Sequence, residues 1–115
     1  MTEVSYTINL KKPRTGKEIS EAVKELAEEI GISFFQRLYS FHDGKRRYDV
    51  GFVDTKVWGE VSIYGDSGVV ALDDAYQRVN VNASERSGKN IPAEEVEQVI
   101  QKMGEYKENL ERRLG

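Results

Sequence analysis

Two carboxylates near the middle of the chain, Asp49 and Glu60, have types and spacing that could do chemistry. The turn signals described below place them opposite each other on neighbouring strands, where like charges disfavour pairing by up to ~1 kcal/mol. Such a pair can act as an acid and a base, or bind a divalent cation. The alternative is a structural charge pair that Arg47 or a small shift of register neutralises. No further ligand set or nucleophile accompanies them, so we predict neither a bound metal nor a cofactor.

Other catalytic residue types are scarce. The chain has no cysteine and one histidine, His42. Disulfides, thiolate nucleophiles and cysteine-ligated zinc are therefore excluded, and one histidine makes a histidine metal site or a catalytic triad hard to assemble. These absences favour a protein that is not an enzyme.

Residues 83–90 lie between a predicted strand and a predicted helix and contain Gly88-Lys89, as a phosphate-binding loop would. The match fails at both ends, because Ala83 stands where the first glycine is needed and Asn90 replaces the magnesium-binding serine or threonine. A looser anion site, formed by Arg86, Lys89 and the amides at the start of the helix, is the remaining functional hypothesis. The alternative is a loop without a ligand.

Two helices are predicted by their apolar periods and their end signals. Thr15 followed by Glu18 indicates a capping box, and apolar residues then repeat at helical spacing until Gly31, which suits a helix end. Near the other end of the chain, Pro92 suits the first turn of a second amphipathic helix that continues to Leu114.

The remaining segments alternate between apolar and polar residues, which is the period of half-buried strands. Residues 4–10 form the first of these, and Asp43-Gly44 predicts a two-residue hairpin turn between residues 34–42 and 45–53. In that register Arg37 faces Val50 on the apolar face. Turns near Asp54, at residues 65–68 and near Asp73 predict three further strands, with Asp49 opposite Glu60 and Ile63 opposite Val70.

These elements predict one α+β domain that spans residues 1–115. The element order is β-α-β-β-β-β-β-α, with an antiparallel meander sheet and two amphipathic helices packed on one face. The opposite, outward face combines aromatic, aliphatic and basic side chains, a composition typical of protein interfaces. The candidate interface residues are Phe34, Leu38, Arg47, Trp58, Tyr64, Tyr76 and Arg78. The alternative is that a helix covers this face, or that Trp58 packs over the backbone of Gly51.

Two other functions use the same sheet. Aromatic residues beside arginine can stack the bases of a single-stranded nucleic acid, with phosphate contacts from residues 45–47. Asp49 and Glu60 would lie in the middle of that platform, however, and no RNA-binding motif is present. A small-ligand pocket between the sheet and the C-terminal helix, around Arg37 and Gln77, is the third hypothesis.

Charge and hydropathy place limits on the partners. The chain has 17 basic and 20 acidic residues, so its net charge of −3 gives no overall attraction to nucleic acid or to an anionic membrane. The first residues do not have the pattern of a signal peptide, and no apolar run is long enough to span a membrane. We therefore expect a cytoplasmic, non-enzymatic domain that binds another protein, or a second copy of itself, through its outward sheet face, as an adaptor or inhibitor would.

Overall fold

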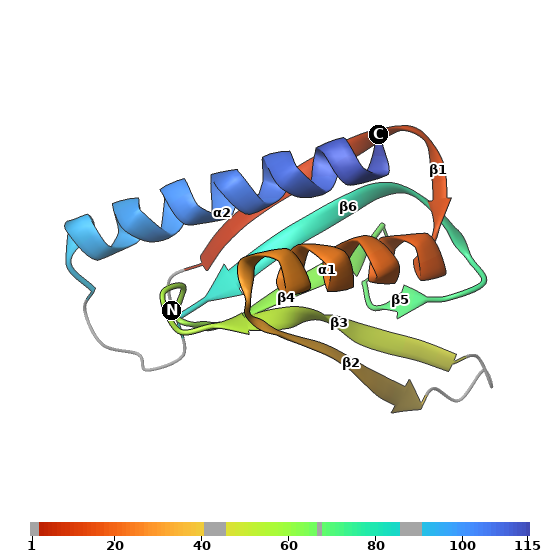
Figure 1. The fold of residues 1–115 in the computed structure, drawn as a ribbon, viewed down its shortest axis with the longest axis horizontal. Coiled ribbons are helices and arrows are strands. Elements are labelled where there is room, and N and C mark those ends of the chain that lie inside the picture. Colours follow the sequence, from red (N-terminus) through yellow and green to blue (C-terminus); the bar gives the residue numbers. More distant parts are fainter. Residues whose placement is uncertain (1–2, 41–45, 67, 86–90) are drawn as a thin grey trace.

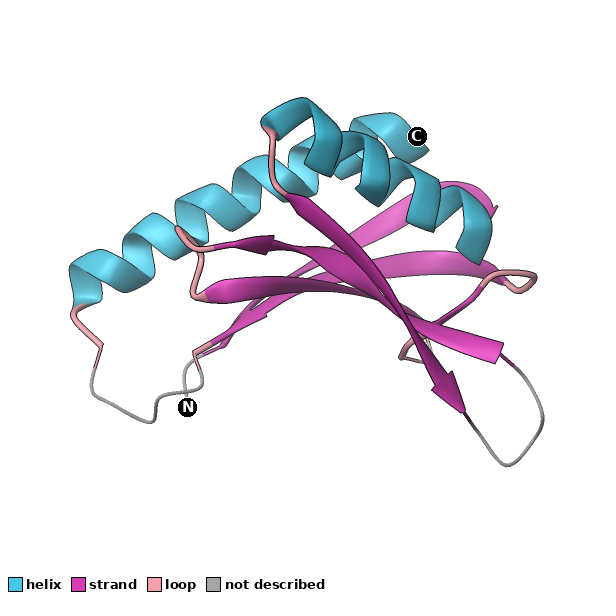
Figure 2. Ribbon diagram, turned by 60° about the horizontal axis from the view of Figure 1, so that its bottom comes forward, coloured by secondary structure: helices cyan, strands magenta, loops and turns pink. Residues whose placement is uncertain are grey.

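The chain folds into one antiparallel sheet with both helices on the same side (Figures 1 and 2). The computed structural model describes residues 3–40, 46–66, 68–85 and 91–115. The predicted fold class and element order are confirmed. The elements are β1 (Glu3–Thr15), α1 (Gly16–Ile30), β2 (Ser33–Ser40), β3 (Arg46–Asp54), β4 (Gly59–Gly65), β5 (Val70–Ala71), β6 (Ala75–Ser84) and α2 (Ala93–Leu114).

The strand order in the sheet is β1-β6-β4-β3-β2, so the first strand lies beside the last. The short strand β5 pairs with β3 rather than with β4, and Tyr48 rather than Ile63 is the partner of Val70. Between β4 and β5, Gly65 and Gly68 exchange backbone hydrogen bonds of 2.7 and 3.2 Å. The prediction that Ile63 faces Val70 is therefore wrong, because the chain makes a detour at residues 65–68 and then continues along β3.

The pairing of β2 with β3 differs by one residue from the predicted register. Phe34 pairs with Phe52 and Arg37 pairs with Asp49. Since side chains alternate between faces, this shift moves Phe34 and Leu38 to the helix-covered face and Arg37 to the open face. The placement of Phe34 and Leu38 in the outward interface is therefore wrong. The predicted turn at residues 43–44 lies outside the described residues.

Contacts on both faces of β2 explain this register. On the helix side, the Ser20 hydroxyl of α1 donates a hydrogen bond of 2.5 Å to Gln36. On the open side, the ring of Phe35 lies over Gly51, where an added Cβ would be 2.7 Å from the ring and 2.0 Å from the Val61 carbonyl oxygen. Phe35, and not Trp58, therefore packs over the bare backbone of Gly51.

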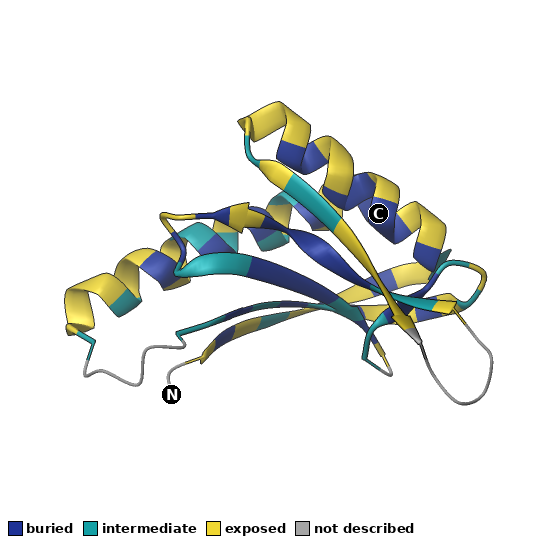
Figure 3. Cartoon of the chain, turned by 90° about the horizontal axis from the view of Figure 1, so that it is seen from below, coloured by how far each residue is buried: buried dark blue, intermediate teal, exposed yellow. Residues whose placement is uncertain are grey.

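The hydrophobic core fills the space between the sheet and the two helices (Figure 3). Its largest fully buried side chains are Phe52, Ile8, Ile19, Leu26, Ile63, Met103 and Leu110. The rings of Phe52 and Tyr106 meet edge to face, with centroids 4.9 Å apart. Both helices thus bury their apolar sides against one face of the sheet, which leaves the other face uncovered.

Tyr76 belongs to this core and not to the outward face. Only 4% of the residue is exposed, and its ring occupies the place where a Cβ on Gly65 would point. Its hydroxyl oxygen accepts a hydrogen bond of 2.7 Å from the amide of Ala71. The alternation of β6 is broken at Gln77 and Arg78, which are both exposed. The sequence pattern therefore placed Tyr76 on the wrong face of the sheet.

Both helices have the predicted character. The Thr15 hydroxyl accepts a hydrogen bond of 3.2 Å from the Glu18 amide, and the Glu18 carboxylate accepts one of 3.1 Å from the Thr15 amide. These bonds confirm the capping box, and Gly31 ends α1 in a left-handed conformation with φ of 74°. In α2 the buried residues recur at helical spacing. Neither helix in the described part of the chain is long and apolar enough to cross a membrane.

The capping box gives the first testable prediction. Replacing Thr15 by alanine leaves the amide of Glu18 without its side-chain acceptor and should lower the free energy of unfolding by about 1 kcal/mol. Urea unfolding followed by circular dichroism measures this change. Thr55→Ala, at an exposed turn residue, is the matched control and should change little. Equal stability of Thr15→Ala and the unmodified chain would contradict a stabilising cap.

Candidate binding site on the open sheet face

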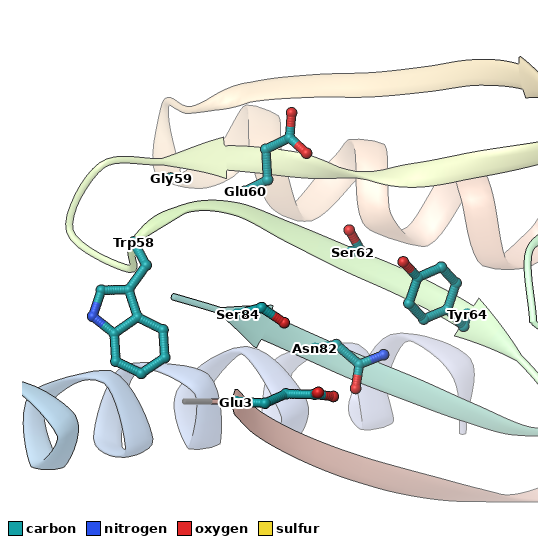
Figure 4. A pocket seen from close by; sticks show the side chains of 8 residues that line it. All are labelled: Glu3, Trp58, Gly59, Glu60, Ser62, Tyr64, Asn82 and Ser84. Carbon is teal, nitrogen blue, oxygen red and sulfur yellow. The ribbon is translucent and has the colours of Figure 1, made fainter. Parts of the chain in front are cut away.

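The open face of the sheet carries a hollow of about 400 Å³ (Figure 4). It lies over β1, β4 and β6, at the end of the sheet where the β3–β4 turn meets the start of α2. Its volume is within the range of small-ligand sites. The lining residues are Glu3, Trp58, Gly59, Glu60, Ser62, Tyr64, Asn82 and Ser84.

Trp58 stands at the edge of the hollow in an unusual backbone conformation. Its φ is 52°, which makes it the one residue other than glycine with a positive φ in the described part of the chain. Bulky residues rarely adopt this left-handed conformation, since it disfavours them by ~1–3 kcal/mol. The indole Nε1–H donates a hydrogen bond of 3.2 Å to Glu95 of α2. The side chain is therefore held both by the turn and by the helix.

Asp54 fixes the turn that carries Trp58. It is buried, and its Oδ1 accepts a hydrogen bond of 3.0 Å from the amide of Lys56 while its carbonyl accepts one of 2.9 Å from Val57. Its other carboxylate oxygen accepts a hydrogen bond from the Tyr106 hydroxyl of α2. Burial, together with this hydrogen bond, raises the pKa of Tyr106, so the hydroxyl remains a donor. The turn and α2 are thus joined by a hydrogen bond between two buried side chains, those of Asp54 and Tyr106.

Asp49 and Glu60 are held together by Arg37. Its guanidinium donates a hydrogen bond of 2.5 Å to Asp49 and bonds of 3.0 Å to both oxygens of Glu60, while its carbon lies 4.2 Å from the centroid of the Phe35 ring. The bonds to Glu60 first, and to Asp49 second, raise the pKa of Arg37 above its ordinary value. Arg37 therefore stays charged and neutralises one of the two carboxylates.

This cluster corrects the sequence interpretation. Asp49 and Glu60 are not directly opposite, because Glu60 pairs with Val53 and Asp49 pairs with Arg37. The guanidinium of Arg37 bonds both carboxylates. One oxygen of Asp49, Oδ1, is buried and accepts no hydrogen bond. Among the described residues no group of three or more His, Asp or Glu side chains is placed to hold a metal ion.

The other predicted site residues are dispersed. Trp58 and Tyr64 line the hollow. Arg47 lies away from it, beside Tyr39 of the neighbouring strand, and Arg78 forms a 3.7 Å ion pair with Asp66. The anion-site candidates, Arg86 and Lys89, lie outside the described residues.

The third hypothesis placed a ligand between the sheet and α2, around Arg37 and Gln77. Arg37 instead lies on the open face, and Gln77 is exposed and donates a hydrogen bond of 2.6 Å to the Leu10 carbonyl. Core side chains such as Phe52 and Tyr106 fill the middle of the space beneath α2. A hollow of about 460 Å³ lies between β1 and the C-terminal end of α2, away from Arg37 and Gln77, and is lined by Asn9, Leu10, Lys11, Glu111, Arg112 and Gly115.

Sequence reasoning did not assign Glu3 to the site and placed Arg37 on the wrong face of the sheet. The first was detectable, because the alternation of β1 places residue 3 on the same face as Ser5 and Thr7. The second was hidden by the one-residue error in the register of β2.

Comparison of the chain with protein-family models, with curated proteins and with solved structures found no match.

The Arg37 cluster gives the second prediction. Replacing Arg37 by glutamine removes the guanidinium that bonds the buried carboxylate of Asp49, and should destabilise the fold by about 1–3 kcal/mol. Adding Asp49→Asn to this variant removes the unpaired charge and should restore part of the stability. Urea unfolding of the two single variants and the double variant measures the coupling. Strictly additive effects would mean that Arg37 and Asp49 do not interact.

Proposed function

We propose that this protein is a binding domain that recognises a segment of another protein on the open face of its sheet. Both helices cover the opposite face, and the open face is hollowed beside Trp58. The observation that carries the proposal is the position of Trp58, a large and partly exposed aromatic residue held in a disfavoured backbone conformation at the edge of this hollow.

The conformation of Trp58 favours a functional role over a structural one. A tight turn that needs positive φ at successive positions ordinarily contains asparagine and glycine, and here Trp58 precedes Gly59 with φ of 105°. Residues kept in such conformations cluster at binding and active sites. Tryptophan is also the residue type that contributes most often to the energetic centre of a protein interface.

The charges of the hollow favour a protein partner over a nucleic acid. Its described lining contains the carboxylates of Glu3 and Glu60 and no basic residue. Phosphate groups would meet these negative charges, whereas a nucleic-acid site needs cations that contact the backbone. In this proposal the protein acts in the cytoplasm. It binds its partner without a catalytic step, because Asp49 and Glu60, the predicted acid–base pair, are both engaged by Arg37.

A capture experiment tests this proposal. The tagged protein, Trp58→Ala and Tyr39→Ala are each incubated with an extract of the source cells and washed at high salt. A partner should be retained by the unmodified protein and lost with Trp58→Ala. It should be kept by Tyr39→Ala, which removes an exposed aromatic residue on β2, outside the hollow lining. Mass spectrometry identifies the retained protein, and absorbance detects nucleic acid.

A second variant guards against loss of folding. If Trp58→Ala lowers the melting temperature strongly, Ser84→Arg places a long side chain in the hollow without removing the tryptophan. Retention of the same partner by Ser84→Arg would refute a site in the hollow. Capture of nucleic acid that salt releases would instead favour the nucleic-acid alternative. A dimer that dissociates in Ser84→Arg, seen by light scattering, would identify the partner as a second copy of the chain.

A further inference from the structure

The described lining of the hollow carries net negative charge. Glu3 and Glu60 line it from β1 and β4, and no lysine, arginine or histidine does so in the described residues. The Arg37 guanidinium contacts the carboxylates of both Asp49 and Glu60. The bare oxygen of Asp49 lies on the same face and has no donor. The lining residues that the structure describes therefore offer acidic groups and no cation to a ligand.

Aromatic rings stand beside these carboxylates. Trp58 and Tyr64 both line the hollow, and the indole is oriented by its bond to Glu95. The face of a tryptophan ring attracts cations, and the attraction is stronger when water is excluded. Because Glu95 is itself a carboxylate, the surroundings of the ring add further negative potential. An aromatic wall beside acidic groups is the chemistry that recognises an ammonium or a guanidinium group.

Neutral polar groups complete the lining. The hydroxyl oxygens of Ser62 and Ser84 can accept hydrogen bonds from the N–H groups of a cation. Figure 4 shows both serines between the tryptophan and the tyrosine, above the strands β4 and β6. These acceptors can replace part of the water that a charged group loses on entering the hollow.

From these observations we infer that the hollow binds a positively charged side chain, lysine or arginine, of the partner segment. This inference rests on the proposed function and specifies which chemistry the open face recognises. An acidic segment is disfavoured by Glu3 and Glu60. A neutral ligand such as a sugar would use the aromatic and hydroxyl groups but not the carboxylates.

The chain contains a single tryptophan, so fluorescence of Trp58 reports directly on the hollow. The purified protein is titrated with blocked glycine-flanked pentapeptides whose central residue is arginine, lysine, glutamine or glutamate. The arginine and lysine peptides should change the emission in a saturable manner, and added salt should weaken their binding. The glutamine and glutamate peptides should have little effect.

Charge variants separate the cation site from a general acidic surface. Glu3→Gln removes one carboxylate of the lining. It should weaken the binding of the basic peptides about 5-fold, which is the effect of one charge near the surface. Glu28→Gln removes an exposed carboxylate of α1 and should change nothing, as the matched control. Glu60 is left intact, because its replacement would release Arg37.

The outcomes distinguish the two proposals. Equal responses to all four peptides, no response to any, or a response to a neutral disaccharide alone would overturn the cation site. So would binding of basic peptides that Glu3→Gln leaves unchanged. If the captured partner depends on Trp58 but not on Glu3, the binding function stands and the cation site falls. If basic peptides bind as expected but the Trp58→Ala variant still captures the partner, the cation site stands and the proposed function falls.

Discussion

Burial on a single face of the sheet is the constraint on which the rest of the structure depends. The strands β1, β3, β4 and β6 all turn their apolar residues toward the same side, and neither helix alone covers that surface. Both α1 and α2 therefore lie on one face, and the polar face remains open. The candidate site is a consequence of this arrangement, because Tyr64 and Ser62 lie on the surface that the helices leave uncovered, and Trp58 stands at its edge, where it is bonded to α2 and packs against the core. The Asp54–Tyr106 bond connects the two sides, since it attaches the turn beside the hollow to the helix over the core.

The sequence predicted those elements whose signals are local. Both helices were found because capping residues and apolar periods act over a few residues, as Thr15 and Gly31 show. The register of β2 was not found, because both of its faces carry apolar side chains, such as Phe34 and Phe35, and alternation cannot choose between them. Long-range contacts decide the choice, among them the bond from Ser20 to Gln36 and the bonds from Arg37 to two carboxylates on other strands.

The candidate site was predicted in part for the same reason. Tyr64 follows the regular alternation of β4, and Trp58 was noticed as an aromatic residue near it. The hollow itself depends on the left-handed backbone at Trp58 and on the spatial closeness of β1, β4 and β6, which no local pattern encodes. Tyr76 was misplaced because the alternation of β6 breaks at Gln77, where two successive residues are exposed. The residues predicted on the open face thus differ from those observed there where the backbone is irregular.

The pairing of β1 with β6 has a consequence for how the protein is made. β6 is the strand neighbour of β1 in the sheet. Glu3 pairs with Ser84, although most of the chain lies between them in the sequence. During synthesis β1 leaves the ribosome before β6 and has no strand partner until residues 75–84 have followed. Contacts of such sequence separation form slowly, because a long loop must close before they stabilise the fold. Glu3 and Ser84 both line the hollow, so this part of the candidate site forms only when β1 has paired with β6.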